Sequence, residues 1–310
     1  QRVEKVSAAK EGKPLWPRSL ARAEGAATTE HEGQRLKPAS DPDAPFPYTC
    51  VADEKRGRVY VSIWAKATVL VLDAATGADL ARWPVGQHPN EMLLAPDGRL
   101  FVAESNFNTV SVIDTATGRI TETLSSSLYP NSPPGSMPNS LALSPDGELL
   151  FVANANNNNV AVFDVETPGK ARSLGFIPVG WFPTSVRVSR DGRTLIVANG
   201  KGLASSPNPK GPYPGTTVPR DLQEYIGGLF RGTGSLIELP AEKKRAEQFG
   251  QWSKTAFACC PLAPDASVRG TNLRPAGNPI PARLGEASPI KYVIYVVREN
   301  RTYDQIFGDL

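Results

Sequence analysis

The fold is decided by a repeat: residues 89–118 read PNEMLLAPDGRLFVAESNFNTVSVIDTATG, and residues 138–169 read PNSLALSPDGELLFVANANNNNVAVFDVETPG. The first half of this pattern recurs in residues 183–200, PTSVRVSRDGRTLIVANG. A looser copy occupies residues 47–77, PYTCVADEKRGRVYVSIWAKATVLVLDAATG. The prolines that open the copies stand at positions 47, 89, 138 and 183. A period of about 45 residues indicates a repeated supersecondary unit.

Each copy divides into four short β-strands separated by turns. In the second full copy the first strand covers residues 140–143, the second 149–153 and the third 160–163. An Asp-Gly turn follows the first strand and an Asn-rich turn the second, and in the copies at 47–77 and 89–118 an Asp-x-x-Thr-Gly turn follows the third, at residues 73–77 and 114–118. All of these turns favour tight reversals. Four antiparallel strands cannot bury both faces alone, so we predict an all-β fold, a β-propeller of stacked four-stranded blades. A β-sandwich is the alternative, but it does not repeat one turn signature in register.

About four blades are expected in residues 45–240, as part of a seven-bladed ring, because propellers need roughly four to eight blades to close. The last copy is interrupted by a Gly/Pro/Ser-rich insertion, residues 201–219, and resumes at residues 232–240 with the third-strand motif. Residues 1–44 carry no blade pattern. Residues 241–289 comprise a charged, helix-permissive stretch and a Pro/Gly-rich linker, and residues 290–310 begin a different domain.

Composition excludes several classes of protein. The net charge is only +3, and 34 basic and 31 acidic residues are interspersed, so we expect no nucleic-acid partner. No apolar run approaches the roughly 20 residues that span a bilayer. The cysteines, Cys50 and the adjacent Cys259 and Cys260, have neither metal-site spacing nor a disulfide framework.

The run IKYVIYVV, residues 290–297, has the apolar, β-branched character of a buried parallel strand and is followed by Arg298-Glu299-Asn300. We predict that it is the first strand of a truncated α/β domain. Polar residues at the carboxyl end of such a strand commonly hold ligands. Glu299 and Asn300 offer oxygen atoms suited to a hard divalent cation, although by spacing alone such a pair is more often a capping turn.

The segment SPIKYVIYVVRENRTYDQIFGDL, residues 288–310, resembles the opening of the phosphoesterase family related to phospholipase C and acid phosphatases, in the alkaline phosphatase superfamily. The blades resemble the YVTN-type propeller repeat. The two together, with NGKGL at 199–203 and YIGGL at 225–229, resemble bacterial proteins in which such a propeller precedes the phosphoesterase domain.

The resemblance implies a secreted or periplasmic enzyme with a divalent metal ion in its phosphoesterase domain, which is the propeller's expected partner. It assigns Glu299 and Asn300 as metal ligands. The hydroxyl nucleophile and the remaining Asp or His ligands of the family lie downstream of these motifs, so the catalytic residues stay unknown here. We therefore expect this chain alone to have no phosphoesterase activity.

A second hypothesis is a binding propeller without enzymatic role, whose loops hold a small molecule or a protein. The candidate contacts are Asn106, Asn156 and Trp181, together with Trp64, Phe107, Phe182 and the rest of the Asn156 to Asn159 run. Each has a structural explanation as well, since Asn makes turns and aromatic residues pack between blades.

A third hypothesis is a propeller enzyme, such as a lactonase or a quinone-dependent dehydrogenase, with a metal in the central channel. The chain has only two histidines, His31 and His88, far apart in sequence. This hypothesis requires His88 to face the channel together with an acidic residue such as Glu91 or Glu104.

Overall fold

The computed structural model describes residues 2–6, 14–19, 44–130, 132–202, 209–211, 215, 217–224, 230–259, 277–281 and 286–296. These residues form β-strands, short 3-10 helices and one α-helix. The strands are β1 (Arg2–Val6), β2 (Pro14–Ser19), β3 (Pro47–Asp53), β4 (Arg58–Ile63), β5 (Thr68–Asp73), β6 (Asp79–Pro84), β7 (Pro89–Leu94), β8 (Arg99–Glu104), β9 (Thr109–Asp114), β10 (Arg119–Ser125), β11 (Pro138–Leu143), β12 (Leu149–Asn154), β13 (Asn159–Asp164), β14 (Arg172–Pro178), β15 (Pro183–Val188), β16 (Thr194–Asn199) and β17 (Thr233–Glu238). The helices are η1 (Trp64–Lys66), η2 (Ala155–Asn157), η3 (Arg220–Leu222) and α1 (Glu242–Cys259).

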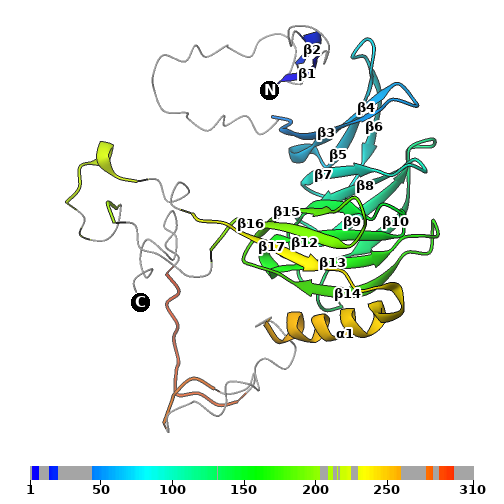
Figure 1. The fold of residues 1–310 in the computed structure, drawn as a ribbon. Helices are drawn as coiled ribbons and strands as arrows, with labels where there is room; N and C mark the ends of the chain where they lie inside the picture. Colours follow the sequence, from blue (N-terminus) through cyan, green and yellow to red (C-terminus); the bar gives the residue numbers. More distant parts are fainter. Residues whose placement is uncertain are drawn as a thin grey trace.

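The repeats fold into successive antiparallel sheets, which confirms the propeller prediction. Strands β3–β6, β7–β10 and β11–β14 form four-stranded sheets, here blades 1, 2 and 3, and β15–β17 form a three-stranded blade 4. The first strand of each blade contacts the first strand of the next, so β3, β7, β11 and β15 lie innermost. Figure 1 shows the blades stacked in chain order. Strands β1 and β2 pair separately.

The turn residues adopt the backbone conformations that the sequence predicts. Gly98 and Gly147, which close the Asp-Gly turns, have φ values of +95° and +81°, a region that residues with a Cβ avoid. Asn108 and Asn158 end the Asn-rich turns with φ values of 56° and 52°. Asn is one of the few residues that adopt this left-handed conformation readily. The turns therefore fix where each strand reverses.

Apolar side chains from facing sheets fill the space between blades. Phe101 of blade 2 and Phe151 of blade 3 occupy the same position on the second strand, and each is fully buried against the following blade. Burying one such ring contributes about 2–3 kcal/mol. The three clusters between blades centre on Tyr60, Val71, Leu100 and Val102; on Phe101, Val112, Leu150 and Val152; and on Phe151, Val162, Leu195 and Val197.

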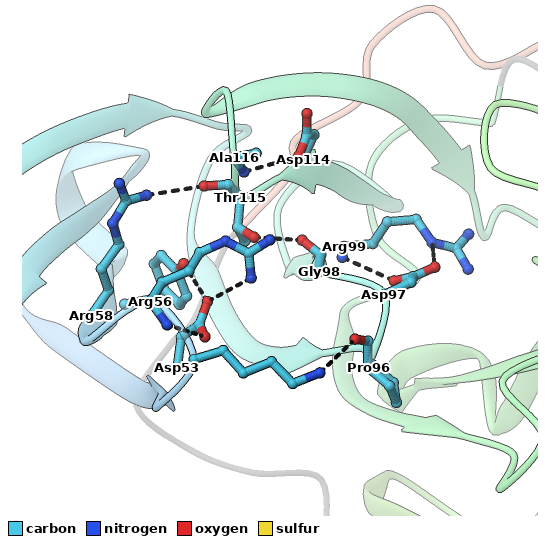
Figure 2. A network of polar contacts seen from close by, with 12 residues as sticks. Asp53, Arg56, Arg58, Pro96, Asp97, Gly98, Arg99, Asp114, Thr115 and Ala116 are labelled. Atoms are coloured by element: carbon cyan, nitrogen blue, oxygen red, sulfur yellow. Dashed lines mark hydrogen bonds and ion pairs between the residues drawn. The ribbon is translucent and has the colours of Figure 1, made fainter.

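Arginines add polar links between blades at the end where the Asp-Gly turns lie. Arg58 donates from Nη1 to the carbonyl oxygen of Thr115 in blade 2, at 3.0 Å (Figure 2). Arg99, at the same position one blade later, donates from Nη1 to the carbonyl oxygen of Val165 in blade 3, at 2.7 Å. In blades 1 and 2, the arginine that begins the second strand thus forms a hydrogen bond to the next blade.

Blade 4 ends differently from the others. Strand β17 pairs with β16 in continuous register after the insertion, as predicted for the interrupted copy. The chain then forms α1 where the predicted helix-permissive stretch lies, and α1 packs along β14 of blade 3 (Figure 1). Ser253 of α1 accepts a hydrogen bond from the Phe176 amide at the edge of β14. The predicted domain limits at residues 240 and 289 stay predictions.

The predicted strand at 290–297 is absent over residues 290–296, where the chain makes no sheet pairing. Its side chains are exposed, reaching 90% at Ile294. A strand forms only where a neighbouring strand takes up its backbone hydrogen bonds, and no described strand pairs with this segment. In the part of the chain that the structure describes, no helix has the length and apolar character needed to cross a membrane.

Candidate functional site

One end of the propeller gathers most of the residues that the sequence singles out. At this end, here called the loop face, lie the turns between second and third strands and the connections from one blade to the next. These segments are residues 64–67, 85–88, 105–108, 126–130, 132–137, 155–158 and 179–182. Asn106, Asn156 and Trp181 all belong to it.

The three predicted ligand contacts are separate from one another on this face. Asn106 donates from Nδ2 to Oε1 of Gln87 at 2.8 Å, so it fixes the connection between blades 1 and 2. The Asn156 side chain is exposed, and Trp181 is 45% exposed. Within the described residues, no hydrogen bond or ring contact links any two of the three. A ligand role for them stays a prediction.

A bulky residue with left-handed backbone precedes the proline that opens each innermost strand. Phe46, His88, Met137 and Phe182 have φ values of 45°, 55°, 56° and 57°. This conformation costs a residue with a Cβ roughly 1–2 kcal/mol. One hydrogen bond recurs at all four sites: the residue's carbonyl oxygen accepts from the first amide of the adjacent turn, at 2.8–3.1 Å. That bond offsets part of the cost.

His88 lies in an aromatic stack on the loop face. Its ring stacks on Trp64, with centroids 3.7 Å apart and an interplanar angle of 13°. Phe46 contacts Trp64 edge-on, with ring centroids 6.3 Å apart. Among the described residues, no hydrogen bond or ion pair given for His88 involves Glu91 or Glu104. His88 thus belongs to an aromatic stack on the loop face, at the connection between blades 1 and 2.

Glu104 has a buried carboxylate that links the connection at Gly86 to strand β9. It is 2% exposed, and Oε1 accepts from the Gly86 amide at 2.7 Å and from the Ser111 hydroxyl at 2.5 Å. Oε2 accepts from the Thr109 hydroxyl at 2.5 Å. A Cβ at Gly86 would collide with this carboxylate, which explains why glycine stands there. Glu104 is therefore a structural residue in this arrangement.

The innermost strands of blades 2, 3 and 4 bring the carboxylate of Glu91 and the guanidinium of Arg187 together. Arg187 Nη2 lies 2.9 Å from Glu91 Oε1, and Arg187 Nη1 donates to Ser140 Oγ at 3.2 Å. Glu91 Oε2 also accepts from the Leu141 amide at 2.7 Å. Because that amide is not used by the neighbouring strand β12, Glu91 must lie along the free inner edge of β11. The pair therefore lines the channel side of blades 2 to 4.

Arg187 departs from the repeat, and sequence reasoning missed it. The corresponding residues of the other blades, Val51, Leu93 and Ala142, pack against the next blade. Arg187 instead turns back toward Glu91, and its side chain is 57% exposed. Departures from a local rule are expected at functional sites. Aligning the fifth residue of each innermost strand would have revealed it.

A second polar group lies at the opposite end of blade 1 (Figure 2). Asp53 accepts from the Tyr60 hydroxyl at 2.9 Å and from the Arg56 amide at 3.1 Å, and it forms an ion pair with the Arg56 guanidinium at 3.2 Å. Burial alone raises the pKa of the Asp53 carboxyl, but these bonds outweigh it and leave the pKa below its usual value. Burial, and then the bond to Asp53, raise the pKa of Tyr60. The donors that Asp53 binds come from blade 1 itself, so we interpret this group as structural.

The predicted metal ligands Glu299 and Asn300 lie outside the described residues. Within the described ranges, no group of three or more His, Cys, Asp or Glu residues is arranged to hold a metal ion. Cys50 and Cys259 are exposed free thiols. Cys260 and His31 also fall outside the described residues.

Solved structures similar to this chain cover about half of it. Hydrazine synthase of Kuenenia stuttgartiensis is 22% identical, with a TM-score of 0.46, over 56% of this chain and 47% of that one. A protein from Lactobacillus plantarum is 26% identical, with a TM-score of 0.43, over 51% and 52%. A putative 6-phosphogluconolactonase from Bacteroides uniformis is 17% identical, with a TM-score of 0.45, over 51% and 50%. This chain thus spans about half the length of these structures.

Sequence comparisons identify the family. No curated protein matches the chain. The profile of the family described as "Lactonase, 7-bladed beta-propeller" matches residues 47–203, just over half of the 310 residues. The phosphoesterase-like residues 288–310 lie beyond this match. By this match, the chain belongs to the lactonase family of seven-bladed β-propellers.

Proposed function

We propose that this chain is the propeller part of a secreted or periplasmic, metal-dependent phosphoesterase, and that the propeller itself takes no part in the chemical step. The observation that carries this proposal is the state of residues 290–296. Tyr292, Ile294 and Tyr295 are 86–90% exposed and pair with no strand. An apolar run of this kind is suited to burial inside a sheet. It leads directly into Glu299-Asn300, within the segment that resembles a phosphoesterase opening.

The donor set at the end of this run suits a divalent metal ion. Glu299 supplies a carboxylate and Asn300 an amide oxygen, which are ligands that hard cations prefer. When bound, such an ion supplies neutralisation of the negative charge that develops on a phosphoryl group. In this proposal Glu299 and Asn300 hold the ion, and the blades position the domain or its substrate.

The first experiment is to read the encoding DNA beyond the codon for Leu310. A frame that continues into an α/β domain with a Ser or Thr nucleophile supports the proposal, and a stop codon at that point overturns it. The expressed product of the continued frame should hydrolyse an aryl phosphate with added Mn²⁺ or Zn²⁺. Glu299→Gln should lower both bound metal and turnover, by about tenfold or more, as loss of a charged ligand does. The matched variant Glu286→Gln, outside the motif, should change neither.

A second candidate function is favoured by the family match and by the Glu91–Arg187 pair: hydrolysis of a lactone at the channel. In this reaction Glu91 takes a proton from water as the water oxygen attacks the ring carbonyl. The carbonyl carbon–ring oxygen bond then breaks, and the ring oxygen takes up the proton held by Glu91, which yields a hydroxy acid and restores the carboxylate. The Arg187 guanidinium would stabilise the oxygen anion that forms on the carbonyl.

This second candidate is tested with glucono-δ-lactone as the probe, at constant pH, by titration of the acid released. Glu91→Gln should lower the rate above background by about a hundredfold, the usual size of a general-base contribution. Glu148→Gln, whose side chain is 42% exposed and pairs with Arg245, is the matched control. A wild-type rate equal to spontaneous hydrolysis would refute the lactone function without affecting the phosphoesterase proposal.

A further inference from the structure

The loop face of blade 2 carries an aromatic ring and a pair of amide side chains next to one another. A Cβ added at Gly86 would lie 2.9 Å from Cδ2 of Phe107, so the Phe107 ring rests on the backbone of the connection between blades 1 and 2. The next residue of this connection, Gln87, accepts a hydrogen bond from Asn106, which directly precedes Phe107. The ring and the amide pair therefore adjoin.

The amide pair presents one donor and one acceptor to the solvent. Asn106 Nδ2 donates to Gln87 Oε1 at 2.8 Å, and both side chains are exposed. Within the described residues, no hydrogen bond engages Gln87 Nε2 or Asn106 Oδ1. If both amides are rotated, the other oxygen and nitrogen are left instead, so a donor lies beside an acceptor in either case. Because a hydroxyl group both donates and accepts, two adjacent hydroxyls of a ligand match this pair.

The backbone holds the amide pair in place. The Asn106 amide donates to the Gln87 carbonyl oxygen at 3.5 Å, and the Ser105 amide donates to the His88 carbonyl oxygen at 3.1 Å. The connection and the turn that carry the two amides are thus bonded to each other through main chain and side chain. Groups that are fixed before a ligand arrives lose less conformational entropy when it binds.

The repeat does not account for these two amides. The same backbone bond joins the two positions in every blade, but only blade 2 has amide side chains at both. The positions hold Pro45 and Ala65 in blade 1, Ser136 and Asn156 in blade 3, and Trp181 and Lys201 in blade 4. A structural role shared by all blades therefore does not explain the pair.

The exposure of Phe107 does not result from where the stack of blades ends. This ring is 44% exposed although blade 2 has a neighbouring blade on each side (Figure 1). The side chains of Gln87, Asn106 and Phe107 carry no charge. The Glu104 carboxylate beneath them is buried, and both of its oxygens accept hydrogen bonds from protein donors. This arrangement favours a neutral ligand over a phosphate or a carboxylate.

A second aromatic surface begins at the next residue of the connection. His88 stacks on Trp64, and Phe46, which is 39% exposed, contacts Trp64 edge-on. The face of an aromatic ring is negative, so it attracts the weakly positive C–H groups of a ligand. Aromatic walls with a few placed polar groups are typical of sites for small molecules.

We propose that this part of the loop face binds a neutral saccharide. A pyranose ring has an apolar C–H face and adjacent hydroxyls at its edge, which are the two features that the site complements. One ring packs its C–H face on Phe107, and two of its adjacent hydroxyls bond to Gln87 and Asn106. The next sugar unit of the chain lies over Trp64 and Phe46. This inference goes beyond the proposed function and does not depend on it.

The probes are cellopentaose and mannopentaose, two chains of neutral pyranoses, titrated into the full 310-residue chain by calorimetry. At least one of them should bind saturably, with a Kd of about 1 mM or tighter. Sorbitol has adjacent hydroxyls but no ring, so it lacks the face that packs on Phe107. It should bind at least about tenfold more weakly than the pentasaccharide.

Substitutions on the protein separate the two kinds of contact. Phe107→Ala removes the ring and should weaken binding at least about tenfold, whereas Phe107→Tyr keeps the ring and should retain it. Gln87→Leu keeps the size of the side chain but removes the amide, and should weaken binding about five- to tenfold. Ile120→Ala is the matched control, because Ile120 is also 44% exposed but lies on β10 at the opposite end of blade 2. Circular dichroism checks that each variant folds.

Three results would overturn the inference. The first is that neither pentasaccharide binds at about 5 mM. The second is that folded Phe107→Ala and Gln87→Leu variants bind the pentasaccharide as tightly as the wild type does, because the ligand would then lie elsewhere. The third is that sorbitol binds as tightly as the pentasaccharide, since the aromatic ring would then contribute nothing.

Discussion

Gly86 offers a sharp test of how the loop face is held together. A Cβ at position 86 would lie closer than 3.0 Å to the carboxylate of Glu104 and to the ring of Phe107. The carboxylate cannot move away freely, because it is buried and accepts hydrogen bonds from the Gly86 amide and from the hydroxyls of Thr109 and Ser111. Gly86 does not have a positive φ, so a methyl group there adds no backbone strain.

The expected cost follows from these bonds. A methyl group that displaces the carboxylate breaks at least one hydrogen bond to a charged acceptor, which contributes about 1.5–3 kcal/mol. We therefore expect Gly86→Ala to lower the free energy of unfolding by about 2 kcal/mol, measured by urea denaturation at neutral pH. Gly250→Ala, on α1 with no atom within 4 Å of the added Cβ, should instead gain about 0.5–1 kcal/mol.

A double-mutant cycle separates this cause from a general effect of the methyl group. With Glu104→Ala in place, the obstacle is gone, and Gly86→Ala should cost less than about 0.5 kcal/mol. The two substitutions are then coupled by more than about 1 kcal/mol. If Gly86→Ala costs the same in both backgrounds, the carboxylate is not the obstacle and the reasoning fails.

Three further outcomes follow from contacts described above. Arg99→Ala, which removes the buried bond to the Val165 carbonyl, should cost about 1–3 kcal/mol in urea, whereas an unchanged midpoint would show that this link contributes nothing. The pKa of Asp53 is lowered in the folded state, so the ionised Asp53 carboxyl stabilises the fold above about pH 4, and this contribution is lost as the pH falls below that value. Asp53→Asn should therefore flatten the decline of the unfolding free energy between about pH 4 and pH 2. An unaltered pH profile would contradict this. Ser253→Ala leaves the buried Phe176 amide without its acceptor and should lower thermal stability by about 1–3 kcal/mol, with Ser253→Thr as the conservative comparison in calorimetry.

The blades could be predicted from the sequence because their signals are local. Asp-Gly and Asn-rich turns fix the reversals within a few residues, and the strands between them alternate or run apolar as a stacked sheet requires. Even the interrupted copy was predictable, since GTGSLIELP keeps the third-strand pattern across the insertion. Gly98 and Asn108 show how directly such residues determine backbone conformation.

Of the Glu91–Arg187 pair only Glu91 could be predicted from the sequence, because the pair joins two residues that lie far apart in the chain. The hypothesis of a propeller enzyme pairs Glu91 with His88, whereas in the structure Glu91 forms an ion pair with Arg187, 96 residues away. Nothing in the local sequence of either residue specifies that distance. His88 was predictable as a loop residue, whereas its stacking on Trp64 depends on how two blades meet. The exposed run at 290–296 fails as a strand for the same reason, since its pairing depends on segments elsewhere.

The linear order of the blades has a consequence for how the molecule opens. Apart from the ion pair between Arg187 and Glu91, the described blades pack on their immediate neighbours, so local stability behaves approximately like that of a one-dimensional array. Blades 2 and 3 have a neighbour on both sides, and the outward residues of blade 1, including Val61 and Leu70, are buried. Blade 4 has one neighbour and an exposed edge, so its amide hydrogens should exchange first. The free end of the stack at blade 4 is therefore where opening of the array begins.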